Sequence, residues 1–139
     1  MMAAPELADI AKLTSGTIAL GFQPISSGVV RAGYARGGNA LGLESVDQTW
    51  FFLDTGWHFA DGDTTAHNAT RAINDRIETA SRAAGFYLPY IFMNDASWDQ
   101  NVIAHYGMKS VQRLREVQRK YDPEKVFQKL VSGGFKLPV

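Results

Sequence analysis

Residues 49–59 read TWFFLDTGWHF, a run of aromatic and β-prone side chains. A run that is apolar at successive positions predicts a central strand, buried on most of both faces. The acidic turn at residues 60–63 follows, and from residue 64 to residue 84 small and apolar side chains recur at steps of three or four. This spacing predicts a long amphipathic helix, with Asp63 as its N-cap.

Shorter segments on either side of this unit also favour β structure. Residues 17–23 (TIALGFQ) predict a strand, and residues 87–93 (YLPYIFM) predict a third. Pro89 places the third strand at a sheet edge, because proline has no N–H for the ladder. Residues 25–47 are rich in glycine, which suits a loop or a bulged hairpin.

Two further helices are expected, one over residues 5–13 and one from about residue 111 to residue 121. The predicted fold class is therefore α+β, a small and mostly antiparallel sheet with helices packed on one face. Three strands are few for so apolar a sheet. A dimer mate that offers the same surface is expected to complete it, so the predicted assembly is a homodimer.

Composition narrows the class of protein. The 139 residues predict a single domain, with residues 1–98 forming a ββαβ part and residues 99–139 a C-terminal helical clasp. Fourteen basic residues balance fourteen acidic ones, which disfavours a nucleic-acid partner. The chain lacks the apolar run of about 20 residues that a membrane helix needs, and it has no cysteine and no recognisable secretion signal. We therefore expect a soluble, cytoplasmic protein.

Four stretches together resemble a known family. They are GGNALGLE at residues 37–44, the strand TWFFLDTGWHF with its acidic turn and helix, PYIFMNDASWDQNVIAHYG at 89–107, and RLREVQRKYDPEKVFQKLVSGGFKL at 113–137. In this order and spacing they resemble the C-terminal part of the berberine-bridge-type FAD-linked oxidoreductases, fungal branch. The resemblance implies part of a substrate domain plus a C-terminal clasp, and no residues here resemble the FAD-binding domain.

The resemblance also implies a ligand-facing segment. If the family's roles are carried over to this chain, Tyr90 and Asn94 line the flavin and substrate pocket and face a ligand. Asp95 then begins a turn. The alternative is local, because Asn94 and Asp95 also suit an Asx turn at a strand end.

His58 is the candidate proton-transfer residue. It follows Trp57 at the end of the long strand, and a carboxylate from Asp54 or Asp95 would fix its tautomer. Trp57 is a candidate for the wall of an apolar substrate pocket. The alternative is a histidine that hydrogen-bonds to the neighbouring turn.

The glycine-rich stretch carries a third candidate set. Arg31, Tyr34 and Asn39 combine basic, hydroxyl and amide groups that hold a carbonyl or enolate oxygen in many sites. Solvated loop side chains are the alternative. Three scattered histidines and no cysteine disfavour a metal site.

Three functions are compatible with these residues. The first is a flavin-free enzyme without a cofactor, which binds a hydrophobic natural-product intermediate and catalyses cyclisation, isomerisation or dehydration. The second is a truncated or split oxidoreductase subunit that uses FAD held by a separate flavin domain, and the third is a non-catalytic metabolite-binding protein. Under the first, Phe127, Phe135 and Leu137 of the clasp are expected to pack on their own domain or on the dimer mate.

Overall fold

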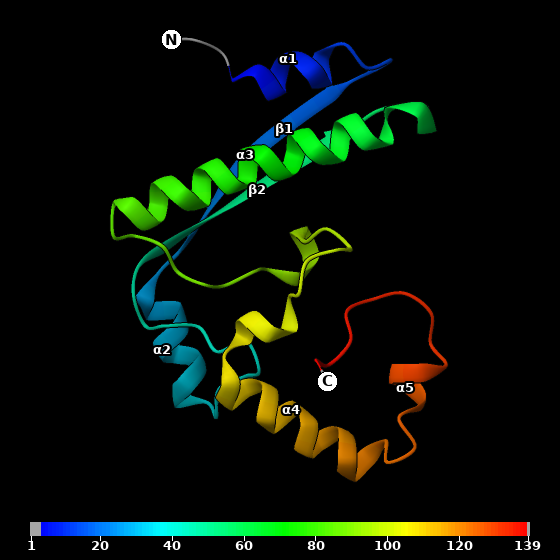
Figure 1. Ribbon diagram of the computed structural model, residues 1–139. Coiled ribbons are helices and arrows are strands. Elements are labelled where there is room, and N and C mark those ends of the chain that lie inside the picture. Colours follow the sequence, from blue (N-terminus) through cyan, green and yellow to red (C-terminus); the bar gives the residue numbers. More distant parts are fainter. Residues whose placement is uncertain (1–3, 139) are drawn as a thin grey trace. The chain divides into compact units, whose positions relative to one another are not determined.

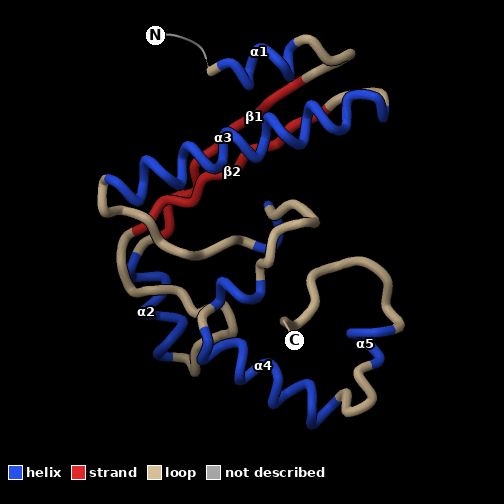
Figure 2. Tube along the Cα trace, viewed as in Figure 1, coloured by secondary structure: helices blue, strands red, loops and turns tan. Residues whose placement is uncertain are grey.

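The computed structural model describes residues 4–138, and its elements confirm the α+β class (Figures 1 and 2). In chain order they are α1 (Pro5–Ala11), β1 (Thr17–Ile25), α2 (Ser27–Ala35), β2 (Gln48–Gly56), η1 (Ala60–Gly62), α3 (Asp63–Ala83), η2 (Met93–Asp95), η3 (Ile103–Tyr106), α4 (Met108–Tyr121) and α5 (Val126–Lys129). The elements labelled η are single 3₁₀ turns. Among the described residues, no helix is long and apolar enough to cross a membrane.

The sheet has two antiparallel strands, β1 and β2, in the part of the chain that the structure describes. The predicted strand over residues 87–93 is wrong, because this segment is irregular and runs into the 3₁₀ turn η2. Pro89 offers no N–H to a ladder, and the turn leaves too short an extended stretch to pair. The homodimer that would complete the sheet stays a prediction.

The glycine-rich stretch is not wholly a loop, because it contains α2. The Ser26 hydroxyl oxygen accepts a hydrogen bond from the Val29 N–H at 3.3 Å and so caps the helix. The Ser27 N–H donates to the Asp47 carboxylate at 2.7 Å, which ties the helix start to the end of the following loop. The paired serines were the sequence signal for this helix, and the surrounding glycines obscured it.

The described chain falls into two compact units, each made from two separate stretches. The first comprises residues 4–23 and 51–88. Figure 1 shows α3 running along the two strands, and α1 also packs on α3. Ala66 and Ala69 are buried on α3, and their small side chains allow this close packing. The Thr70 hydroxyl donates to the Thr55 hydroxyl of β2 at 3.0 Å, which fixes the helix on that strand.

Two predictions about the first unit are corrected. Asp63 is the first residue of α3 rather than its N-cap, and its carboxylate accepts from the Trp57 indole N–H at 2.7 Å. The residues of β2 are mostly half-buried, not buried on both faces. On β1, Leu20 and Phe22 are 57% and 66% exposed, because two strands and one covering helix leave part of the sheet open.

The second unit comprises residues 24–50 and 89–138. Its buried apolar side chains come from α2, from η3 and the residue before it, and from the start of α4. They are Val30, Val102, Ile103, Tyr106 and Val111. The loop before β2 comes so close to η3 that a Cβ on Gly42 would stand 2.2 Å from the Tyr106 carbonyl oxygen. Only glycine fits there, and its φ of 69° also favours glycine.

The C-terminal segment folds back within the second unit. Asp122 caps the first turn of α5 from outside the helix, because its two carboxylate oxygens accept from the Val126 and Phe127 N–H groups at 2.7 and 3.2 Å. The Arg115 guanidinium donates to the Pro138 carbonyl at 2.7 Å, and the Leu137 N–H donates to the Gln128 side chain at 2.9 Å.

The burial of the clasp differs from residue to residue. Phe135 and Leu137 are half-buried, as expected for residues that pack on their own unit. Phe127 is 65% exposed, so its predicted packing on its own unit is wrong for the chain alone. The carboxylate cap orders the backbone at Phe127 without giving its ring an apolar contact surface.

The Gly42 contact gives a first testable prediction. Gly42→Ala should lower the free energy of unfolding by about 2–4 kcal/mol, because it adds a backbone clash to left-handed strain. Gly37→Ala is the matched control, since Gly37 also has positive φ but a Cβ there meets no heavy atom within 4 Å. It should cost only about 1 kcal/mol. Urea unfolding followed by tryptophan fluorescence measures both, and equal losses would contradict the proposed clash.

Candidate functional site

An aromatic cluster lies in the second unit, where the start of β2, the segment after residue 88 and η3 meet. The Tyr90 ring stacks on Tyr106, with centroids 5.7 Å apart and an angle of 19° between planes. Trp50 contacts both Tyr90 and Phe92, at centroid distances of 4.8 and 4.9 Å. Pairs at such distances stabilise beyond their buried area and hold the rings in fixed orientations.

The indole of Trp50 is held by a buried glutamine. Its Nε1–H donates to Gln48 Oε1 at 2.9 Å, and the Gln48 amide nitrogen donates to the Glu44 carbonyl at 3.0 Å. Gln48 is only 8% exposed, and both of these hydrogen bonds are partly buried. It fixes one wall of the aromatic cluster.

The Tyr90 hydroxyl is buried, and no described residue offers it a hydrogen-bond partner. Burial raises the pKa of Tyr90 to about 12, with a smaller contribution from Tyr106. A buried polar atom without a partner costs roughly 1–3 kcal/mol, so such atoms in folded proteins call for an explanation. This hydroxyl is the feature of the cluster that points most directly to a ligand or a partner group.

Asn94 and Asp95 lie in η2, directly after the cluster. Both are exposed, and the Asp95 N–H donates to the Phe92 carbonyl at 3.1 Å. The structure therefore places Tyr90, Asn94 and Asp95 in one short segment, with the tyrosine half-buried and the polar pair on the surface.

His58, Asp54 and Trp57 belong to the first unit. His58 is exposed; its backbone N–H donates to the Thr14 carbonyl at 3.1 Å, and its ring lies edge-on to Phe59 at 4.4 Å. Within residues 4–138 its ring forms no hydrogen bond to Asp54, which is exposed. Trp57 donates to Asp63, as described above, and its ring lies edge-on to His67 at 5.2 Å. The two Trp57 contacts attach the end of the strand to α3.

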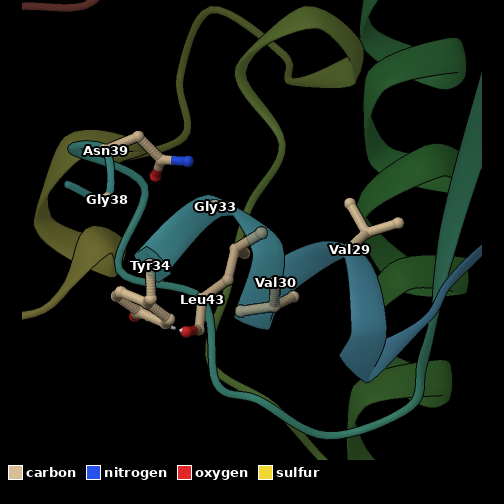
Figure 3. A pocket seen from close by; sticks show the side chains of 7 residues that line it. All are labelled: Val29, Val30, Gly33, Tyr34, Gly38, Asn39 and Leu43. Carbon is tan, nitrogen blue, oxygen red and sulfur yellow. Dashed lines mark hydrogen bonds between the residues drawn. The ribbon is translucent and has the colours of Figure 1, made fainter. Parts of the chain in front are cut away.

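The third candidate set divides between a pocket and the surface. Tyr34 and Asn39 line a small pocket beside α2, which Figure 3 shows together with the other lining residues, Val29, Val30, Gly33, Gly38 and Leu43. Arg31 is exposed on α2 and is not part of this lining. The Ser27 hydrogen bonds lower the pKa of Asp47, and Arg31 adds a smaller electrostatic contribution. Sequence reasoning missed the apolar walls of the pocket because it did not predict α2.

Two cavities among the described residues can be compared in size with a cofactor site. The α2 pocket has a volume of about 60 Å³, well below the roughly 300–1,000 Å³ of small-molecule sites. An open hollow of about 340 Å³ lies along α3, but residues of that one helix line it. Residues 4–138 also contain no group of three or more histidine, aspartate or glutamate side chains placed to hold a metal ion.

The chain is similar to segments of several fungal proteins. It is 38% identical over 126 residues to the bifunctional solanapyrone synthase of Alternaria solani, which is 91% of this chain and 24% of that relative. It is 37% identical over 113 residues to an FAD-dependent monooxygenase of Arthrobotrys oligospora (81% and 22%), and 36% identical over 120 residues to one of Cochliobolus heterostrophus (85% and 23%).

These similarities cover the chain far better than they cover the relatives. The chain spans about a quarter of the length of the curated relatives it matches. No family model matches it, and no solved structure matches it. The chain is thus similar to a segment of fungal FAD-dependent monooxygenases.

The orphaned hydroxyl gives a second prediction. Tyr90→Phe should leave the free energy of unfolding unchanged or raise it by about 1 kcal/mol, because it removes a buried polar atom and keeps the ring contacts. Thermal and urea unfolding at neutral pH measure the change. A loss of more than about 1 kcal/mol would mean that the hydroxyl has a partner.

The same residue gives a third prediction, on pH dependence. The pKa of Tyr90 in the folded chain lies near 12, above the ordinary tyrosine value of 10.0. The unfolded chain therefore loses this proton first, so the stabilising contribution is complete below pH 10 and is lost as the pH rises toward 12. The free energy of unfolding should fall less steeply over this range in Tyr90→Phe than in the parent chain. Identical slopes in the two chains would contradict a buried, neutral Tyr90.

Proposed function

We propose that this chain is the C-terminal segment of a berberine-bridge-type FAD-linked oxidoreductase, consisting of part of the substrate domain and the clasp. It would work with a flavin-binding region supplied by a longer polypeptide or by a separate chain. The single observation that carries this proposal is the coverage of the similarity, which takes in 91% of this chain and 24% of the solanapyrone synthase. The small size of the α2 pocket, about 60 Å³, agrees with it.

In this proposal the aromatic cluster forms one wall of a binding site for a hydrophobic substrate. Trp50, Phe92 and Tyr106 hold the Tyr90 ring in place, and the Tyr90 hydroxyl is the polar group available at that wall. Apolar walls with few, fixed polar groups are typical of sites that orient an apolar ligand. Asn94, on the adjoining surface turn, is the second proposed contact with the ligand.

The exposed apolar side chains of the clasp support the proposal that a partner surface covers them. Phe127, Leu130 and Val131 are 65%, 78% and 47% exposed and lie close together in the chain. An isolated exposed phenylalanine is ordinary, but neighbouring exposed apolar residues mark interaction surfaces. We assign this surface to the flavin-binding region.

The flavin-free enzyme remains the competing hypothesis. It needs a proton-transfer group, but His58 is exposed, and no hydrogen bond joins its ring to a carboxylate among the described residues. Burial and a carboxylate partner are the usual means of tuning a histidine for that work. The geometry therefore favours the flavin-dependent proposal.

Co-expression provides the test. The chain should be co-expressed with the portion of the Alternaria solani relative that lies outside the matched segment. A yellow complex that contains both polypeptides and shows flavin absorbance is expected, whereas the chain alone should be colourless. Phe127→Asp should reduce recovery of the complex by at least about tenfold, because it places a charge in an apolar contact. Met108→Asp is the control, since Met108 is a 91% exposed apolar residue in the same unit that lies at the start of α4 and not in the Phe127, Leu130 and Val131 surface.

The opposite result is equally clear. A colourless chain that turns over a hydrophobic substrate alone, with the solution mass of a dimer, would favour the flavin-free enzyme and the predicted homodimer. If Phe127→Asp leaves recovery unchanged, or if Met108→Asp lowers recovery equally, the surface of Phe127, Leu130 and Val131 is not the interface.

A fourth prediction concerns His58 in the co-expressed complex. His58→Ala should retain kcat within about threefold, because His58 is exposed and its backbone makes the contact with Thr14. Removing a general acid or base typically costs about 10²- to 10⁴-fold. A loss of that size, together with loss of one limb of the pH–rate profile, would restore His58 as a proton-transfer residue.

A further inference from the structure

Helix α2 has a glycine where its backbone needs none. Gly33 lies in the last turn of α2, its φ is not positive, and a Cβ built on it would meet no heavy atom within 4 Å. Glycine inside a helix costs about 1 kcal/mol relative to alanine. A local rule broken without a compensating contact is expected at functional sites.

The space beside Gly33 is the small pocket of Figure 3. Its walls are mainly apolar, from Val29 and Val30 of α2 and from Leu43 of the following loop. Its volume of about 60 Å³ is less than half of the roughly 150 Å³ cavity that takes up benzene. The pocket therefore suits a short alkyl group, not a ring.

The position of the loop wall is held by the tyrosine. The Tyr34 hydroxyl donates to the Leu43 carbonyl at 2.7 Å, so it is already engaged and its ring forms a fixed wall. A Cβ on Gly38 would lie 3.4 Å from this ring. The pocket is thus held open by hydrogen-bonded loop structure and is pre-formed in the chain.

Asn39, which is exposed, supplies a polar side chain at the edge of the lining. Its side-chain oxygen accepts from the Leu41 N–H at 2.9 Å, which orients the amide. Its Nδ2 donates to no group among residues 4–138, and an amide nitrogen in this state is a donor for a ligand oxygen. The lining therefore combines an alkyl-sized space with one hydrogen-bond donor.

We propose that this pocket binds the methyl-ketone or isopropyl-ketone end of a small apolar molecule. The alkyl group occupies the space beside Gly33, and the carbonyl oxygen accepts a hydrogen bond from Asn39 Nδ2. The site lies within the second unit and involves no residue of the aromatic cluster. It does not rest on the flavin-dependent function proposed above.

Two probes test the apolar and polar parts of the pocket separately. Xenon under pressure reports on the apolar space, and 3-methyl-2-butanone reports on the space and the donor together. Both should shift the methyl NMR signals of Val29, Val30 and Leu43 in the full chain, with saturation. The methyl signals of Val126 and Val131, elsewhere in the same unit, should not move.

Three variants give the proposal its controls. Gly33→Leu should weaken binding of both probes by at least about tenfold, because it fills the space. Gly28→Leu lies in the same helix and raises helix propensity equally, but a Cβ there only touches the Ser26 hydroxyl oxygen at 3.6 Å, so both affinities should stay unchanged. Asn39→Asp keeps the acceptor for Leu41 and removes the donor, so it should weaken the ketone about 3- to 10-fold and leave xenon unchanged.

Several outcomes would overturn the proposal. Methyl shifts spread over both units, or equal effects of Gly33→Leu and Gly28→Leu, would mean that the probes bind non-specifically. An Asn39→Asp variant that binds the ketone normally would remove the polar contact. Loss of binding of both probes when the flavin-binding portion of the relative is present would assign the pocket to a polypeptide side chain instead of a small molecule.

Discussion

The close approach of Gly42 to the Tyr106 carbonyl is the constraint on which both candidate sites of the second unit depend. A Cβ at this point would stand 2.2 Å from the carbonyl oxygen, so the loop and η3 are in direct backbone contact. On one side of the contact, the loop carries Asn39 and Leu43 to the α2 pocket. On the other side, the Tyr106 ring stacks on Tyr90. A change at Gly42 therefore displaces the walls of both sites together.

The contact matters because little else in this unit holds the loop. Its other fixed points include the Leu43 carbonyl, which accepts from the Tyr34 hydroxyl. Near the end of the loop, Asp47 accepts from the Ser27 N–H and the Gln48 amide donates to the Glu44 carbonyl. Each is a polar interaction of modest net stabilisation, and the partly buried Gln48 bond is the most costly to break. The loop is thus ordered by a few specific contacts and by little apolar burial, which is a common arrangement where a loop lines a binding surface.

The sequence predicted well those elements whose apolar residues recur at regular spacing or whose ends carry clear helix or strand stop signals. The helix over residues 64–84 was visible because its small residues recur at helical steps, and Ala66 and Ala69 are buried as that pattern requires. Helix α2 was missed because glycines at 28 and 33 lower the apparent helix propensity, although Ser26 provides a cap. The strand over residues 87–93 was predicted from β-prone side chains, whereas Pro89 and the turn at Met93 decide its backbone.

For the candidate sites, the sequence predicted which residue types take part but not how they pack together. The sequence identified Tyr34 and Asn39 as polar residues near glycines, and both line a pocket, but the valines and leucine that form its walls followed from the unpredicted helix. The segment at Tyr90 and Asn94 was implied by the family resemblance. The burial of the Tyr90 hydroxyl depends on Trp50 and Tyr106, which lie far from it in the sequence, so no local pattern reveals it.

Exposed apolar rings and a buried hydroxyl without a hydrogen-bond partner differ in how strongly they indicate a binding partner. Exposed rings such as Phe22 and Phe127 cost an isolated chain little, because folded proteins expose much apolar surface in any case. The Tyr90 hydroxyl is different, since it has already lost its water and has gained no partner among the described residues. A ligand or a neighbouring polypeptide that supplies one acceptor would recover that loss at once. If the chain is a segment of a larger flavoenzyme, removing the Tyr90 hydroxyl should therefore weaken the complex. The free energy lost there should exceed any change in the stability of the isolated chain.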